Sequence, residues 1–295
     1  MTRRLLITFV SAACLVAPGV AGSQRAPTLK VLAARGATPD VGIKIFVPTG
    51  SVRLVAWDHD SIVARGHVGP HAHFFFAHGE GKSSYKLGVE PQPLDAQVGP
   101  CEFVIDVPRR AKISVKAVDA AVTAEGVGGW FYTVSGAIHL SGDAEHVEAE
   151  SIRGDVDLDV ASMLVKARTG RGHMIVRGSP QDVDASTVGG PLDIATSTIL
   201  RGRFGSVTGN IRYAATPAPG GVFEFSDHAG SVDLLLPRSA SSKLELSSVT
   251  GAIANGFTQV SPASAVAHSL TVRLGSGDAH MTVRTFKGAI RLLPQ

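Results

Sequence analysis

Cysteine, aromatic residues and charge are all scarce in this chain. Its 295 residues include two cysteines, 6% aromatic residues and 18% charged residues. Helical proteins keep their outer faces in water with many Glu and Lys side chains, and Gly destabilises a helix by about 1 kcal/mol relative to Ala. A chain with 33 glycines and so little charge is therefore not expected to be mainly helical. Its hydrophobic content of 44% is high enough to form a core, which argues against a disordered chain.

The longest apolar run lies at the N-terminus, and it predicts an export signal. Arg3 and Arg4 precede this run, which extends from Leu5 to Ala17, and small residues at 18–22 provide a cleavage site. The run is shorter than the roughly 20 residues that cross a bilayer, so an integral membrane protein is not expected. We expect an exported protein, located in the periplasm, at the outer membrane or outside the cell.

Cleavage of this signal would change the cysteine and charge counts. Without Cys14, Cys101 has no partner, so no intramolecular disulfide is expected. Loss of Arg3 and Arg4 reduces the 28 basic residues by two, against 25 acidic residues, and the formal charge becomes about +1. The remaining basic residues are scattered along the sequence rather than clustered. Nucleic acid is therefore not an expected partner. An alternative is a lipoprotein in which Cys14, after Ser11-Ala12-Ala13, is acylated.

A short pattern recurs along the chain: Gly, any residue, an aliphatic residue, any residue, an aliphatic residue. The first three intervals between its glycines are each 18 residues, and the later ones are 19, 21, 21, 26 and 11. A second apolar pair stands five and seven residues before almost every glycine. The glycines are Gly136, Gly154, Gly172, Gly190, Gly209, Gly230, Gly251, Gly277 and Gly288.

The alternation of apolar and polar residues predicts strands with one buried face. Two short strands repeated about every 18 residues indicate an all-β fold, a β-solenoid or roll-like stack of coils around a narrow core. Each glycine is expected at a turn that requires positive φ or close backbone approach. A β-sandwich remains an alternative, since frequent short strands also suit it. The last strand, ending at Leu293, is expected to form an edge that Pro294 blunts.

Several of these stretches resemble a known family. They are the Val-Pro corner at Val47-Pro48, the following Trp57-Asp58-His59-Asp60, and the Val-x-Ala-x-Ser-x-x-Gly-Asp-Val-x-Leu pattern of 147–158. They are similar to the bacterial putative-adhesin family of β-strand-repeat envelope proteins. This resemblance covers about 41–293 and implies an exported β-repeat fold with unknown function and no established active site.

The expected domain organisation follows from these segments. A signal peptide occupies 1–22, a linker 23–40 and the β-strand-repeat domain 41–293. Two departures from the family pattern, a His-rich insertion at about 66–100 and wider spacing after Gly251, argue against an unbroken solenoid.

The His-rich segment holds the candidate metal ligands. His71 and His73 alternate in an extended chain, which would place both imidazoles on one side in a geometry that suits Zn²⁺ or Cu²⁺. No third ligand has a diagnostic spacing, so a solvated hairpin before Phe74 is the favoured interpretation, and no metal or cofactor is predicted. The further candidate ligands are His59, His67, His78, Asp58, Asp60 and Glu80.

A ladder of polar side chains is expected on the outer face of the coils. Alternating aspartates could ligate Ca²⁺ through their oxygens, but the Gly-Gly-x-Gly-x-Asp repeat of calcium-binding rolls is absent. Mixed charge favours a solvated face instead. The ladder is expected to contain His139, Asp157, Asp193, Arg212 and Asp233, with His280 and Arg291 in the same register and Asp155 and Asp159 beside it.

The competing hypothesis is a polysaccharide-cleaving solenoid enzyme. Its candidate cluster would be Asp155, Asp157, Arg153, Arg171 and Arg177. Few aromatics lie in this region to stack on sugars, and no Gly-x-Ser-x-Gly motif or phosphate loop occurs. Trp130-Phe131-Tyr132 is expected to fill the start of the core, and exposure of Trp130 and Tyr132, which flank the inward Phe131, is the alternative. The sequence thus predicts a non-catalytic structural, adhesive or ligand-binding module. Its expected partner is a glycan or protein of the cell envelope or surface.

Overall fold

The computed structural model describes residues 30–79, 83–257 and 268–295, and every regular element in these ranges is a β-strand. None of the described residues forms a helix that could span a membrane. The segment 1–22 expected to be a signal peptide, Cys14 and Glu80 lie outside the described ranges.

The strands fall into an N-terminal group and a series of coils. The N-terminal group is β1 (Lys30–Gly36), β2 (Gly42–Trp57), β3 (Ser61–His67), β4 (Ala72–His78), β5 (Ser84–Pro91), β6 (Cys101–Pro108) and β7 (Lys112–Glu125). The coils follow as β8 (Gly129–Thr133), β9 (Ile138–Asp143), β10 (His146–Ser151), β11 (Val156–Ala161), β12 (Leu164–Thr169), β13 (Met174–Gly178), β14 (Asp182–Thr187), β15 (Leu192–Thr196), β16 (Thr198–Ser206), β17 (Ile211–Tyr213), β18 (Thr216–Asp227), β19 (Val232–Leu236), β20 (Ser242–Ser248), β21 (Ile253–Asn255), β22 (Ser269–Leu274), β23 (Ala279–Thr285) and β24 (Ile290–Pro294).

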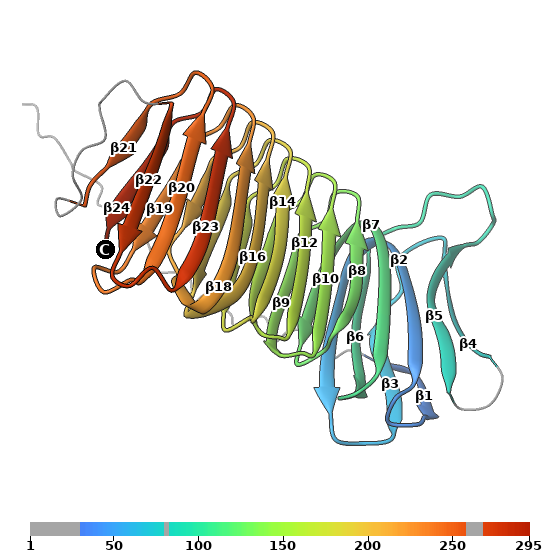
Figure 1. The fold of residues 1–295 in the computed structure, drawn as a ribbon. Helices are drawn as coiled ribbons and strands as arrows, with labels where there is room; N and C mark the ends of the chain where they lie inside the picture. The colour runs from blue at the N-terminus through green and yellow to red at the C-terminus, as the bar shows by residue number, and fades with distance from the viewer. Residues whose placement is uncertain (1–29, 80–82, 258–267) are drawn as a thin grey trace, which may run out of the picture.

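Successive coils stack in parallel, which confirms the predicted solenoid (Figure 1). β10 pairs with β8 and β12, while β11 pairs with β9 and β13. The sequence period of 18 sets this register, since Val147 lies beside Val165 and Val156 beside Met174. Each coil therefore contributes one strand to each of two facing sheets.

The two sheets share β2 and β7, which bend from one sheet into the other. The coil pairings are parallel except that of β20 with β22. The other antiparallel pairs, β1 with β3, β3 with β6 and β4 with β5, lie in the N-terminal group. We call the first sheet the one ordered β4-β5-β2-β7-β8-β10-β12-β14-β16-β18-β23-β20-β22, and the second the one ordered β1-β3-β6-β2-β7-β9-β11-β13-β15-β17-β19-β24-β21.

The C-terminal strand is not an edge, contrary to the expectation from sequence. β24 lies between β19 and β21, and β23 lies between β18 and β20. The last coil is thus inserted before the coil that precedes it in the chain. Gly277 consequently belongs to a turn that leads into the first sheet, and Gly288 is the glycine between the strands of this coil.

The segment expected as a linker and the expected insertion both contribute strands. β1 lies within 23–40 and pairs with β3. Much of the His-rich segment forms the β4–β5 hairpin, and β5 also pairs with β2. This hairpin therefore extends the first sheet rather than interrupting the stack.

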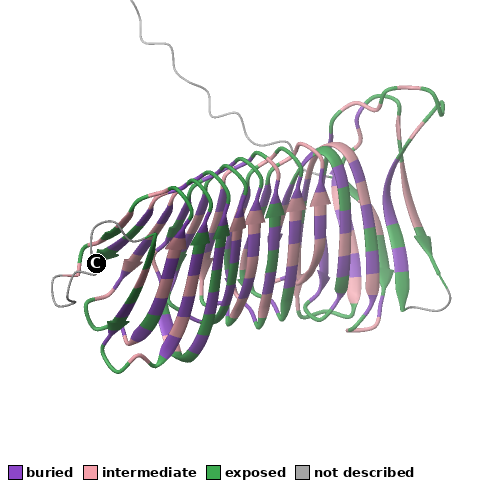
Figure 2. Ribbon diagram, turned by 45° about the horizontal axis from the view of Figure 1, so that its top comes forward, coloured by how far each residue is buried: buried purple, intermediate pink, exposed green. Residues whose placement is uncertain are grey.

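Alternate side chains point into the space between the sheets, and this alternation is visible along each strand (Figure 2). One inward-facing position is occupied on successive strands of the first sheet by Ala149, Ala167, Ala185, Phe204 and Phe225. Tyr213 of the second sheet packs against both phenylalanines, with ring centroids 5.7 and 5.3 Å apart. Large and small side chains together thus fill the narrow core between the two sheets.

A Ser or Thr lies three residues before most coil glycines, and in several coils its hydroxyl accepts a hydrogen bond from the N–H of that glycine. Gly154 N donates a hydrogen bond of 2.8 Å to Ser151 Oγ, and Gly172 N donates one of 3.2 Å to Thr169 Oγ1. A Cβ on Gly154 would overlap the carbonyl oxygen of Gly136 in the preceding coil. Close approach of backbone between coils, rather than positive φ, therefore explains the repeated glycine.

Candidate functional site: the outer face of the second sheet

The five predicted ladder residues lie in one register on the outer face of the second sheet. His139 lies beside Asp157, and Arg212 lies between Asp193 and Asp233. Ile175 separates the two parts of the ladder. Arg291 continues the ladder beside Asp233.

His280 is not part of this ladder, contrary to the expectation from sequence. It lies on β23 of the first sheet, beside Val222 and Lys243. The sequence template placed it after Gly277, but the coil glycine of this segment is Gly288. The side chain at the ladder position is consequently Arg291.

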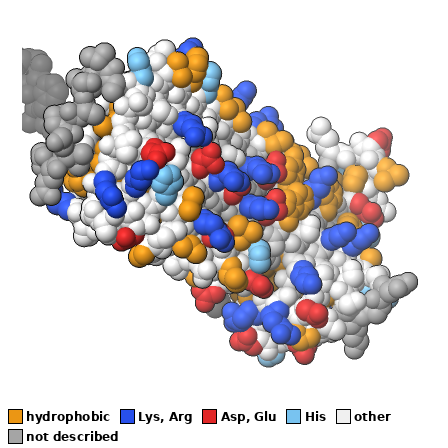
Figure 3. Space-filling model, in the orientation of Figure 1, with side chains coloured by type: hydrophobic (Ala, Val, Ile, Leu, Met, Phe, Trp, Pro, Cys, Tyr) orange, Lys and Arg blue, Asp and Glu red, His pale blue; other side chains and the backbone are white. Residues whose placement is uncertain are grey.

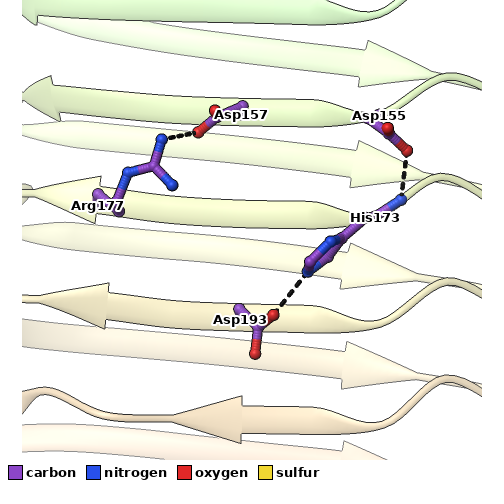
Figure 4. A network of polar contacts seen from close by, with 5 residues as sticks. All are labelled: Asp155, Asp157, His173, Arg177 and Asp193. Atoms are coloured by element: carbon purple, nitrogen blue, oxygen red, sulfur yellow. Dashed lines mark hydrogen bonds and ion pairs between the residues drawn. The ribbon is translucent and has the colours of Figure 1, made fainter.

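Two groups of polar contacts lie on this face, one joining Asp157 to Arg177 and the other joining His173 to Asp155 and Asp193 (Figure 4). Arg177 Nη2 donates a hydrogen bond of 2.5 Å to Asp157 Oδ1, and His139 Nδ1 lies 3.4 Å from Asp157 Oδ2. His173 Nε2 lies 2.6 Å from Asp193 Oδ2. The contacts run from strand to strand, so they join neighbouring coils.

The carboxylate of Asp155 also has a partner, the backbone N–H of His173 at 2.8 Å. Asp155 and Asp157, proposed as the catalytic acids of a glycosidase, are thus each held by groups from the next coil. Arg153 and Arg171 lie in turns, and their side chains make no hydrogen bond or ion pair with described residues. The structure therefore does not assemble the five candidate catalytic residues into one cluster.

Arg212 is the unpaired cation of the ladder. Its exposed guanidinium has no hydrogen bond or ion pair within the described ranges. The flanking carboxylates have other partners: His173 binds Asp193, and Arg291 makes two hydrogen bonds of 2.6 Å to Asp233. This pairing raises the pKa of Arg291, so its charge is retained.

The candidate metal ligands do not gather around one point in the described residues, where no three His, Cys, Asp or Glu side chains are placed to hold a metal ion. Asp58 instead accepts a hydrogen bond of 3.0 Å from Arg109 Nε, which holds the pKa of this carboxyl below its usual value. The ring of His59 packs edge-on against Trp57, with centroids 4.9 Å apart. His71 lies in a turn with a φ of 56°. His73 of β4 lies beside Glu90 of β5, and Asp60 and His67 are exposed.

The outer face of the first sheet carries the aromatic pair Trp130 and Tyr132, in agreement with the alternative in which they flank an inward Phe131. Only Phe131 is buried, whereas Trp130 and Tyr132 are half-buried on the outside with their rings stacked 5.6 Å apart. The alternation of the strand was the signal for this placement. Hydrophobic side chains gather over β8, and charges of both signs cover the strands that follow (Figure 3).

An open groove of about 800 Å³ runs along one edge of the solenoid. It is formed by the turns that lead from the second sheet back to the first, including Gly128 and Gly129. Its lining contains basic Arg110 and Lys112 and acidic Glu145. Its mixed lining shows no preference for one charge.

Comparison with known proteins gives only distant similarity. No family model matches the chain, and no curated protein matches it. A putative adhesin from Bacteroides fragilis NCTC 9343 has a similar solved structure, with 12% identity, a TM-score of 0.42, and coverage of 91% of this chain and 99% of that one. A putative cell adhesion protein from Clostridium sporogenes ATCC 15579 has 8% identity and a TM-score of 0.27, with coverage of 91% and 100%.

Proposed function

We propose that this protein is a non-catalytic binding module of the bacterial cell envelope that holds an extended partner along the outer face of the second sheet. The observation that carries the proposal is the in-register ladder from His139 to Arg291, to which successive coils each contribute a side chain. Export is part of the proposal and rests on the N-terminal segment 1–22.

The ladder suits a repetitive partner. Neighbouring strands are about 4.8 Å apart, so equivalent side chains are presented at a regular interval along a flat face. Each contact with such a solvated face is weak, but contacts linked along one chain raise the overall affinity without any deep pocket. A glycan chain has this repetitive character, and we take it as the partner.

Arg212 is the side chain best placed to bind such a partner. Its guanidinium donors are free, whereas the donors of Arg177 and Arg291 are already used by aspartates. A planar guanidinium binds carboxylate or hydroxyl oxygens with several hydrogen bonds. We therefore expect Arg212 to contribute more to affinity than the paired arginines.

The experiment is binding of the purified protein to a panel of immobilised bacterial and plant polysaccharides. Retention on at least one polysaccharide is expected, with weaker retention of Arg212→Ala and no soluble sugar released. Lys166→Ala, on the outer face of the first sheet, is the matched control and should bind as the wild type does. Absence of retention, or equal losses in both variants, would refute the proposed face.

A further inference from the structure

The edge of the solenoid opposite the groove carries a row of exposed apolar side chains. It consists of the turns in which strands of the first sheet end, at 134–137, 152–155, 170–173, 188–191, 207–210, 228–231, 286–289 and 249–252. The first residue of most of these turns is apolar. We call this set the apolar edge row: Val134, Ile152, Val188, Val207, Phe286 and Val249.

Backbone hydrogen bonds between coils hold the row in line. Ile152 N donates to Thr133 O at 3.2 Å, Val188 N to Thr169 O at 3.1 Å, and Val249 N to Thr285 O at 3.2 Å. Each bond joins the first residue of a turn to the residue that ends the neighbouring strand. In the other two turns the first residue is Gly170 or His228. The ring of His228 stacks on that of Phe286, with ring centroids 5.0 Å apart.

Five of the six side chains of the row are exposed, and Val134 is half-buried. Val188 is 56% exposed, Ile152 46% and Phe286 42%. An isolated exposed apolar residue requires no explanation, but a continuous exposed row is typical of a surface that contacts a partner or a membrane.

Basic side chains stand directly beside the row. Arg153, Arg171 and Lys287 each follow the first residue of a turn, are exposed, and make no ion pair with any described residue. The eight turns contain one acidic residue, Asp155, which is held by His173 N. Hydrophobic, basic and histidine side chains are visible along the upper edge in Figure 3.

The backbone of this edge can approach an apolar phase at low cost. Arg153 N, Thr208 N and Lys287 N all donate to carbonyl groups of the neighbouring coil. Burying an unpaired N–H or C=O group costs several kcal/mol in hydrocarbon, and pairing between coils removes much of that penalty.

We propose that this edge docks the protein on a bilayer surface with anionic headgroups. The apolar edge row would lie at the level of the first acyl carbons, and Arg153, Arg171 and Lys287 would bind phosphate oxygens, as on amphipathic membrane-binding helices. A row of turns along one edge can contact a flat surface, and the charged side chains of these turns are basic except for Asp155. The inference is independent of the glycan-binding face, which lies on the second sheet.

The test is co-sedimentation of the purified protein with phosphatidylglycerol vesicles and with phosphatidylcholine vesicles. We expect binding to the anionic vesicles that weakens with added salt. The triple variant Val188→Ser/Val207→Ser/Phe286→Ser should bind at least tenfold more weakly. The matched control Met163→Ser/Leu200→Ser/Val222→Ser, which changes exposed apolar residues outside the row, should bind as the wild type does.

A second variant, Arg153→Gln/Arg171→Gln/Lys287→Gln, changes exposed side chains without partners and should keep the thermal unfolding temperature of the wild type. This variant is also expected to lose binding to anionic vesicles. It therefore tests the proposal even if the variant Val188→Ser/Val207→Ser/Phe286→Ser does not fold. Equal binding to both kinds of vesicle, no binding to either, or an equal loss in the control triple would overturn the proposal.

Discussion

Asp227 of β18 lies directly beside Thr285 of β23, and its buried carboxylate occupies the coil position that holds Ser or Thr in the neighbouring coils. No donor meets either carboxylate oxygen in full hydrogen-bond geometry among the described residues, and the nearby donors of His228, Ser206 and Gly230 lower the pKa of Asp227 less than burial raises it. Burial raises the pKa of Asp227 from 3.8 to about 6. One coil therefore carries a titratable group where the others carry a neutral hydroxyl.

The carboxyl group of Asp227 predicts a pH-dependent stability. Because the folded-state pKa lies above the unfolded value, the contribution of Asp227 to stability is fully present below about pH 4 and is lost as pH rises through about 6. Asp227→Asn should remove this loss, so the unfolding temperature of the variant should fall less between pH 5 and pH 8 than that of the wild type. Thermal unfolding of both proteins at the two pH values measures the difference. Asp159→Asn, at an exposed site, is the control, and parallel profiles for all three proteins would contradict the prediction.

The glycine repeat predicts a steep cost for any side chain at Gly190. A Cβ there would overlap the carbonyl oxygen of Gly172 in the preceding coil, and overpacking of this kind costs about 1–3 kcal/mol. Gly190→Ala should lower the free energy of unfolding by about that amount. At Gly205 the nearest atom to a Cβ would be Ser186 Cβ at 3.7 Å, so Gly205→Ala should be nearly neutral. Equal effects in urea unfolding would contradict the account.

Two tyrosine hydroxyls predict effects of opposite sign. Tyr213 is fully buried and its hydroxyl has no partner among the described residues, whereas Tyr85 Oη donates a hydrogen bond of 2.6 Å to Gly36 O. Tyr213→Phe should raise the free energy of unfolding by about 1 kcal/mol because an unpaired polar group is removed. Tyr85→Phe should lower it by about 1 kcal/mol because a carbonyl loses its donor. Chemical denaturation distinguishes the signs, and a loss in both variants would count against the placement of Tyr213.

The inserted last coil predicts where the solenoid is sensitive to core truncation. Ile290 of β24 and Ile253 of β21 lie beside each other, but Ile290 is fully buried and Ile253 is partly exposed on the last strand of the second sheet. Ile290→Ala should cost about 2–5 kcal/mol, as in other protein cores, and Ile253→Ala clearly less. A reversed order would support β24 as the edge strand.

The fold was largely predictable from sequence because the coil period is local. Residues 18 apart lie side by side, so a strict spacing from Gly136 to Gly190 implies stacked parallel strands. The alternation within each strand also places Asp157 and Asp193 on the outer face. The first inference follows from the 18-residue period of one coil and the second from the alternation within one strand, so neither requires knowledge of how distant segments pair.

The order of the last coils was not predictable in this way. Gly277 matches the glycine template as well as Gly288 does, and choosing between them requires the knowledge that β23 pairs with both β18 and β20. Pairing partners of this kind are fixed by packing at the end of the stack rather than by spacing. The pairing of Asp58 with Arg109, 51 residues away, escaped prediction for the same reason.

The most direct test of the central claim is to measure binding and product release together on the polysaccharide panel for a graded series of ladder variants. We predict that affinity falls from wild type to Arg212→Ala, and further when Asp157→Ala and Asp193→Ala are added, while no soluble sugar is released from any polysaccharide. Release of sugar that is abolished by Asp157→Asn, or affinity unchanged across the whole series, would contradict the account.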